Sequence, residues 1–208
     1  MRRILVTFFA FLLIGSTSRG TFEERLRDAA LSQPSPWYAP GSTALGALET
    51  PDQYAERVTM ATRELALVTD RDKPPEWRWG CKALAVAVLA HWYEESRFAL
   101  EVHEGIEHPV WTQDKGRARC LGQLHVGLVP EYEWQRLAGL DEAATRRCAL
   151  WTARALTRMA GYCRGKRTKL QDVLVPMFSG LGGGGCSPTA SGRAKAARFA
   201  KMWREVER

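Results

Sequence analysis

The 208-residue sequence lacks the features of non-globular chains. It shows no internal repeat and only ten prolines, and 25% of its residues are charged against 45% that are hydrophobic. This composition excludes a disordered, collagen-like or coiled-coil protein and predicts one packed domain with short appendages. The five cysteines and four histidines show no CxxC or HxxxH spacing. We therefore expect no metal ion, and no cofactor is implied.

After residue 20 no apolar run approaches the roughly 20 residues that a membrane-spanning helix needs. The longest apolar run, residues 4–15, follows Arg2 and Arg3 and precedes the small polar residues 16–18. This order is typical of a secretory signal peptide. We therefore expect residues 1–20 to be a signal peptide or an uncleaved N-terminal anchor. The rest of the chain is expected in the periplasm, the cell envelope or the extracellular space.

Charge is distributed unevenly along the chain. Residues 21–110 carry nine basic and fifteen acidic side chains, whereas residues 111–208 carry eighteen basic and eight acidic ones. The basic half is expected to be attracted to polyanions. For an exported protein these are cell-wall polymers and anionic lipids, so nucleic acid is not an expected partner. A basic face that only contacts water is the alternative.

Helix signals dominate the sequence. Thr50, Pro51 and Gln53 form a capping-box pattern that predicts a helix to about Val68. Other helices are expected over residues 22–31, 77–100, 141–162, 168–178 and 191–207, and strand signals are limited to residues 110–112 and 121–126. The predicted class is mainly α with a minimal β element. Residues 21–50 are expected to be a spacer and residues 51–208 to form the domain.

Residues 83–90 carry the most informative pattern. They are rich in alanine and apolar on every side of a helix, which predicts a helix buried all round. Glu95 lies one helical turn beyond His91 and continues a largely apolar stripe. Burial penalises a carboxylate and raises its pKa, so Glu95 is a candidate general acid. Alternatively, Glu94 is the buried carboxylate, or both mark an exposed helix end and bind arginines such as Arg97.

Three short motifs follow one another in the chain. Residues 93–98 read Tyr-Glu-Glu-Ser-Arg-Phe, residues 119–124 read Arg-Cys-Leu-Gly-Gln-Leu, and residues 177–180 read Met-Phe-Ser-Gly before a glycine-rich loop. In this order they resemble the Glu-Ser, Gly-Leu-Met-Gln and Ala-Tyr-Asn-Ala-Gly signatures of the lytic transglycosylases and goose-type lysozymes. The resemblance covers about residues 78–190.

This resemblance implies a lysozyme-like helical domain that acts as a monomer on the glycan strands of peptidoglycan. It implies that Glu95 is the catalytic acid, that Ser96 and Gln123 shape the site around it, and that Phe178 and Ser179 line the cleft. In a lytic transglycosylase one carboxylate cuts the bond between N-acetylmuramic acid and N-acetylglucosamine. It acts as an acid and then as a base, and it leaves a 1,6-anhydro end.

A goose-type lysozyme would instead direct water to the anomeric carbon. A second carboxylate helps that reaction, because a base can then activate the water. Glu104, Glu107 and Asp114 follow the first motif and are the candidates. The sequence does not choose between the two outcomes.

Two other interpretations stay open. Cys81, expected near the start of a helix, could serve as the thiol nucleophile of a wall peptidase, with His103, His108 or His125 as its base. Alternatively, the protein keeps the lysozyme-like scaffold and binds peptidoglycan, or assists envelope assembly, without turnover.

Five cysteines in an exported chain predict two disulfides and one free thiol. Cys148 and Cys163 lie on one predicted helix, roughly 22 Å apart, so they cannot pair with each other. We expect one bridge between Cys163 and Cys186 and another between Cys81 and Cys120.

Overall fold

The computed structural model describes residues 20–34, 49–104, 118–183 and 185–208. Its elements, in chain order, are α1 (Phe22–Leu31), α2 (Pro51–Arg71), α3 (Cys81–Ser96), α4 (Leu100–Glu104), β1 (Ala118–Arg119), β2 (Leu124–His125), α5 (Glu131–Trp134), α6 (Glu142–Cys163), α7 (Leu170–Leu181) and α8 (Ala190–Glu207). The predicted class, mainly α with a minimal β element, is confirmed. None of the described helices combines the length and the hydrophobicity needed to cross a membrane.

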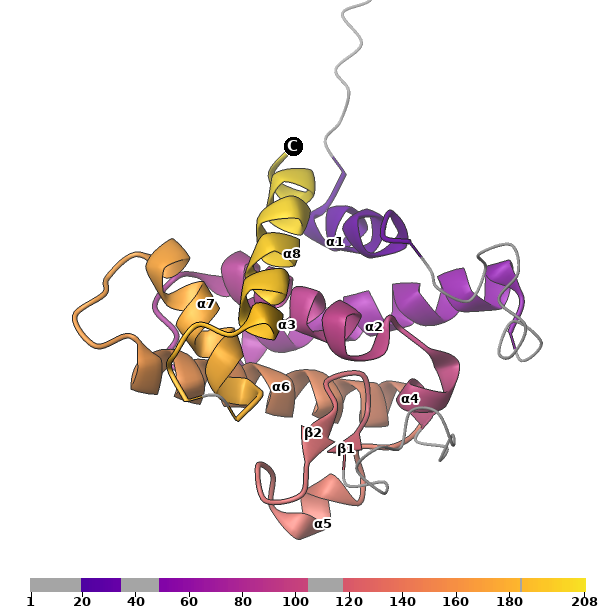
Figure 1. Cartoon of the computed structure of the whole chain (residues 1–208). Coiled ribbons are helices and arrows are strands. Elements are labelled where there is room, and N and C mark those ends of the chain that lie inside the picture. The colour runs from indigo at the N-terminus through magenta and orange to yellow at the C-terminus, as the bar shows by residue number, and fades with distance from the viewer. Residues whose placement is uncertain (1–19, 35–48, 105–117, 184) are drawn as a thin grey trace, which may run out of the picture.

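Helix α3 is the centre of the fold, and α1, α2, α6 and α8 pack around it (Figure 1). Each of residues 83–90 is at most 2% exposed, as the apolar pattern predicted. The helix is shorter than the expected 77–100. It begins after Gly80, whose φ of 84° favours glycine, and it ends at Arg97, which adopts the left-handed conformation.

Side-chain caps fix where the flanking helices begin. The backbone N–H of Gln53 donates to Thr50 Oγ1 (3.2 Å), and the backbone N–H of Thr50 donates to Gln53 Oε1 (2.8 Å). This capping box starts α2, as predicted, and the helix continues to Arg71. Helix α6 begins at a single side-chain cap, because Asp141 Oδ1 accepts from the backbone N–H of Ala144 (2.9 Å).

Helix α1 corrects the expected spacer over residues 21–50. Its helical span matches the prediction, but Leu26, Ala29 and Ala30 are at most 1% exposed and belong to the hydrophobic core. Arg25 Nε also donates to the carbonyl oxygen of Val206 at the end of α8 (2.6 Å). Three buried apolar side chains on one helical face require a packing surface, so α1 is part of the helical body.

The small sheet is a hairpin. Strands β1 and β2 are antiparallel, with Ala118 opposite His125 and Arg119 opposite Leu124. The first half of the strand expected over residues 121–126 is instead the hairpin turn, because Cys120 and Gln123 have left-handed φ values of 59° and 47°. The other strand signal, residues 110–112, lies outside the described residues.

Two disulfides join distant elements. The bridge between Cys163 and Cys186 is confirmed, whereas Cys120 pairs with Cys148 and not with Cys81. Cys81 is a free thiol at the first residue of α3, while the hairpin lies against α6 and brings Cys120 to Cys148. Two disulfides fit an oxidising compartment.

Candidate functional site

The last turn of α3 carries Glu95 to the edge of the core. Directly after it, Ser96 is 1% exposed; its hydroxyl donates to the carbonyl oxygen of Trp92 (2.7 Å) and accepts from the N–H of Phe98 (3.1 Å). Arg97 and Phe98 then adopt left-handed φ values of 52° and 56°. The chain therefore turns away at once and leaves the Glu95 side chain 30% exposed.

A buried arginine from α2 holds this turn. Arg57 Nη2 donates to the carbonyl oxygen of Phe98 (2.7 Å), Nη1 donates to Nδ1 of His103 (3.3 Å), and Nε contacts Glu49 Oε1 (2.6 Å). His103 then donates from Nε2 to Thr145 Oγ1 (2.9 Å). Burial and the charge of Arg57 lower the pKa of His103 to about 3, so the imidazole is neutral. This buried network fixes the backbone that follows Glu95.

Glu95 forms an ion pair with Lys195 of α8. Lys195 Nζ donates to Glu95 Oε1, and the lysine side chain is only 3% exposed. Burial raises the pKa of Glu95. The charge of protonated His91, the charge of Lys195 and the hydrogen bond from Lys195 outweigh burial, so the pKa lies below its ordinary value. The raised pKa expected from the sequence is therefore wrong, because Lys195 arrives from 100 residues further along the chain.

His91 connects Glu95 to two other parts of the predicted site. Its Nε2 lies 3.1 Å from the carbonyl oxygen of Gly122 in the hairpin turn, and its ring stacks on Phe178 of α7 at 6.4 Å between centroids. Its Nδ1 lies 3.9 Å from Glu95 Oε1. Burial and the charge of Lys195 lower the pKa of His91 to about 4, so the ring is neutral near pH 7.

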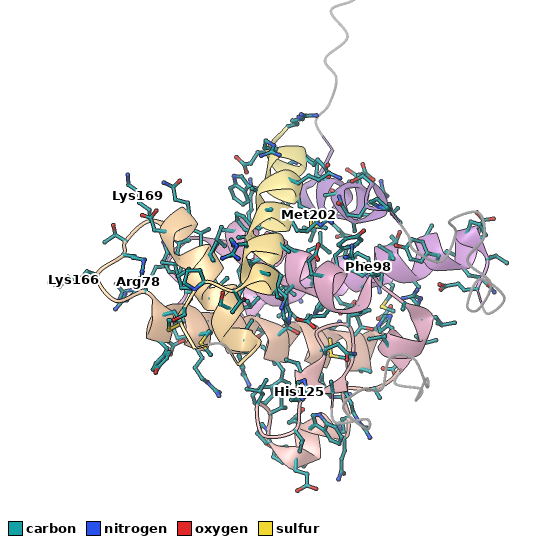
Figure 2. All side chains as sticks on the ribbon, in the orientation of Figure 1. Arg78, Phe98, His125, Lys166, Lys169 and Met202 are labelled. Atoms are coloured by element: carbon teal, nitrogen blue, oxygen red, sulfur yellow. A yellow bond between two sulfur atoms is a disulfide. The ribbon has the colours of Figure 1, made fainter. Side chains whose placement is uncertain are left out.

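His125 of β2 completes the surroundings of Glu95. It is exposed on the hairpin (Figure 2), and its charge lowers the pKa of Glu95. Groups from α3, the hairpin, α7 and α8 thus converge at one end of the central helix. These elements include all three motifs on which the sequence resemblance rests.

The four residues expected to contact substrate differ in their exposure. Gln123 is partly exposed at the hairpin turn, whereas Ser96, Phe178 and Ser179 are at most 1% exposed. Ser179 lies inside α7, which continues past the helix end expected at residue 178, and its hydroxyl accepts from the N–H of Thr189 (3.0 Å). Of these four residues, Gln123 is therefore the one whose side chain keeps surface that a ligand could reach.

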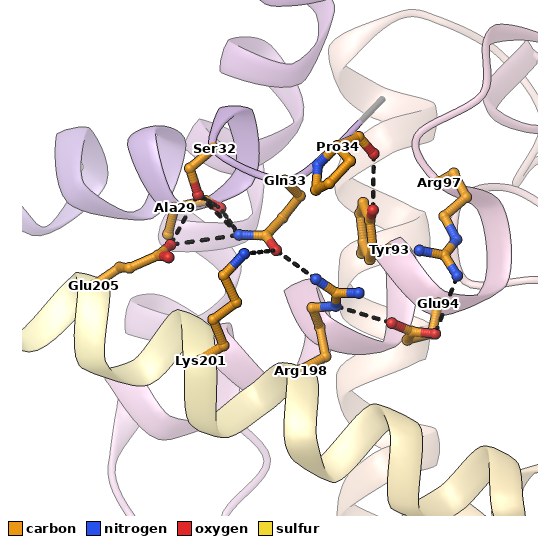
Figure 3. Close-up of polar contacts among 10 residues, drawn as sticks. All are labelled: Ala29, Ser32, Gln33, Pro34, Tyr93, Glu94, Arg97, Arg198, Lys201 and Glu205. Atoms are coloured by element: carbon orange, nitrogen blue, oxygen red, sulfur yellow. Dashed lines mark hydrogen bonds and ion pairs between the residues drawn. The ribbon is translucent and has the colours of Figure 1, made fainter. Parts of the chain in front are cut away.

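Glu94 has a separate set of partners (Figure 3). Arg198 Nε donates to Glu94 (2.9 Å), and Arg97 Nη2 donates to its other oxygen (3.4 Å). Both guanidinium groups also lie over the ring of Tyr93, at 4.3 and 4.5 Å from its centroid. Glu94 is 12% exposed and is therefore more buried than Glu95. With two guanidinium partners it serves the packing of α3 on α8 and leaves Glu95 as the carboxylate with an open edge.

The second carboxylates considered for a hydrolase cannot be located as side chains. Glu104 ends α4, but its side chain is outside the described set, and Glu107 and Asp114 lie outside the described residues altogether. Their role in activating water stays a prediction.

Neither of the two candidate bases that the structure describes, His103 and His125, is available to Cys81 as the base that a thiol nucleophile needs. Cys81 lines a pocket of about 650 Å³ at the N-terminal end of α3, roughly 21 Å from Glu95 along the helix. His103 is engaged by Arg57 beyond the opposite end of α3, and His125 acts on Glu95. His108, the third candidate, lies outside the described residues.

Two members of the site were not recognised from sequence. Lys195 is one of many basic residues in the C-terminal half, and nothing local distinguishes it. His91 was visible as the residue one turn before Glu95, but its contact with Gly122 depends on the fold.

Among the described residues no group of histidine, cysteine and carboxylate side chains is arranged to bind a metal ion. Comparisons of the chain with protein-family models, with curated proteins and with solved structures found no match.

Proposed function

We propose that this protein is a peptidoglycan-cleaving glycosidase, most specifically a lytic transglycosylase that uses Glu95 as its acid and then its base. One observation supports the proposal most. Glu95 is a partly exposed carboxylate at the end of a largely buried helix, and the hairpin, α7 and α8 meet beside it. The order of the three motifs in the sequence is the second support.

The chemistry requires one carboxyl group. In the first step the acid form of Glu95 protonates the glycosidic oxygen while the bond from that oxygen to C1 breaks. The acetamido oxygen of the same sugar stabilises C1. In the second step the carboxylate of Glu95 accepts the proton of the 6-hydroxyl as O6 bonds to C1. The anhydro ring closes, the acid form is restored, and no water is consumed.

The first step needs a proton that the resting site does not favour. The pKa of Glu95 lies below its ordinary value, since Lys195 and protonated His91 outweigh burial. Sugar rings that cover the exposed edge would remove water from the carboxylate and raise its pKa. Activity is therefore expected to be highest on the acid side of neutrality.

The experiment is clearance of a peptidoglycan suspension by the purified protein, with mass analysis of the soluble products. Products lighter by one water than hydrolytic fragments are expected. Glu95→Gln should lower the rate at least about a hundredfold, whereas Glu207→Gln, at the exposed end of α8, should leave it unchanged. Full activity of the Glu95→Gln protein would refute the proposal, and products without the mass loss would make the enzyme a hydrolase.

A second function is favoured by the ion pair itself. A carboxylate held by a buried lysine suits a protein that binds the wall without turnover. Such a protein would sediment with peptidoglycan and release no fragments.

Cys81→Ser provides the test of the thiol interpretation, and we expect it to leave clearance unchanged.

A further inference from the structure

The hydrogen bonds of His91 determine which ring nitrogen carries the proton. A backbone carbonyl can only accept, so the 3.1 Å contact with Gly122 requires Nε2 to be the donor. In the neutral ring Nδ1 is then a bare acceptor. It is buried and has no hydrogen-bond partner among the described residues.

The unpartnered Nδ1 faces Glu95 at 3.9 Å from Oε1. That distance is too long for a hydrogen bond, as expected for two groups that can both only accept. The same oxygen, Oε1, also meets Lys195, an ammonium that can only donate. The Glu95 carboxyl group therefore has one fixed donor and one fixed acceptor as neighbours.

We propose that these two partners hold the two protonation states of Glu95 in turn: Lys195 donates to the carboxylate, and Nδ1 of His91 accepts from the carboxylic acid. When Glu95 takes up a proton, its new hydroxyl turns toward Nδ1 and closes the gap by about 1 Å. The proton stays on Glu95, and His91 keeps its Nε2 proton on Gly122. His91 is thus a positioning residue for the acid.

This arrangement suits a group that must be acid and base within one turnover. Its use in catalysis rests on the proposed function, whereas the hydrogen bonds can be tested without substrate. Among the described residues the titratable groups that act on Glu95 are His91 from α3, Lys195 from α8 and His125 from β2. Phe178 stacks on the His91 ring and limits its rotation.

The test is nitrogen NMR of the protein labelled with 15N-histidine, without substrate. In the wild-type protein Nδ1 of His91 should be unprotonated at neutral pH. Two variants of similar size test whether a donor at position 95 causes the Nδ1 shift. Glu95→Gln carries an amide donor at every pH, and Glu95→Leu carries none. Only the glutamine variant should give the hydrogen-bonded Nδ1 shift at neutral pH.

Identical Nδ1 shifts in the two variants, or a protonated Nδ1 in the wild-type protein at neutral pH, would overturn the inference. Because clearance is assayed separately, a responsive Nδ1 without wall cleavage would refute only the proposed function. Cleavage with a silent Nδ1 would refute only the role of His91.

Discussion

The ion pair between Glu95 and Lys195 gives the sharpest prediction about stability. Its two members differ in exposure, since the lysine side chain is 3% exposed and the glutamate 30%. Replacement of Glu95 by leucine therefore strands a buried ammonium. Replacement of Lys195 by methionine leaves a carboxylate that water can still reach. The first change should destabilise the protein more than the second.

The expected magnitudes follow from these exposures. Opposite charges about 4 Å apart attract by about 4 kcal/mol at an effective dielectric constant near 20. Water at the exposed edge of Glu95 should reduce the coupling to about 2 kcal/mol. Glu95→Leu should cost about 3 kcal/mol, because an unpaired buried charge remains. Lys195→Met should cost about 1 to 2 kcal/mol. The Glu95→Leu/Lys195→Met double variant should be more stable than the sum of the single effects predicts.

The assay is urea denaturation of the four proteins at about pH 7 and at lower pH values. The folded-state pKa of Glu95 is lowered, so the coupling is present above the ordinary carboxyl pKa and is lost as pH falls through the folded-state value. Arg63 and Glu142, whose side chains are 40% and 60% exposed, form the control pair. Their coupling should not exceed about 0.5 kcal/mol. A Glu95–Lys195 coupling no larger than this control would refute the reasoning.

Two further predictions concern the helical body. Gly192→Ala should cost about 2 kcal/mol in thermal denaturation, because the added Cβ would lie 2.9 Å from the backbone nitrogen of Ser179. The control is Gly161→Ala on α6, whose added Cβ meets nothing within 4 Å and should not destabilise the protein. Equal melting temperatures for the two variants would contradict the close contact of α7 and α8. Stability should also fall on acidification below about pH 6.5, because both buried histidines have lowered pKa values. Burial and the charge of Lys195 lower the pKa of His91 to about 4, and burial and the charge of Arg57 lower that of His103 to about 3. The unfolded chain then binds up to two more protons than the folded one, so the free energy of unfolding falls by up to about 2.7 kcal/mol per pH unit. A urea midpoint that stays constant between about pH 6 and 4.5 would refute this prediction.

Several features of the fold were predictable because they depend on near neighbours in the chain. The alanine-rich residues 83–90 predicted a helix with no exposed face, and Thr50 with Gln53 predicted the start of α2. The rise per residue of a helix excluded a bond between Cys148 and Cys163. The same periodicity placed Glu95 on the stripe that ends the central helix, although the direction of its pKa shift was predicted wrongly.

The remaining features depend on which surfaces meet after the helices form. Sequence alone determined that α3 is buried and that a carboxylate stands at its end. Only the tertiary structure decided that Lys195 and Gly122 lie around that carboxylate, and that Cys120 pairs with Cys148. Helix periodicity is set by residues three or four positions apart. The charge that reaches Glu95 comes from a helix 100 residues away, and no local pattern records that approach.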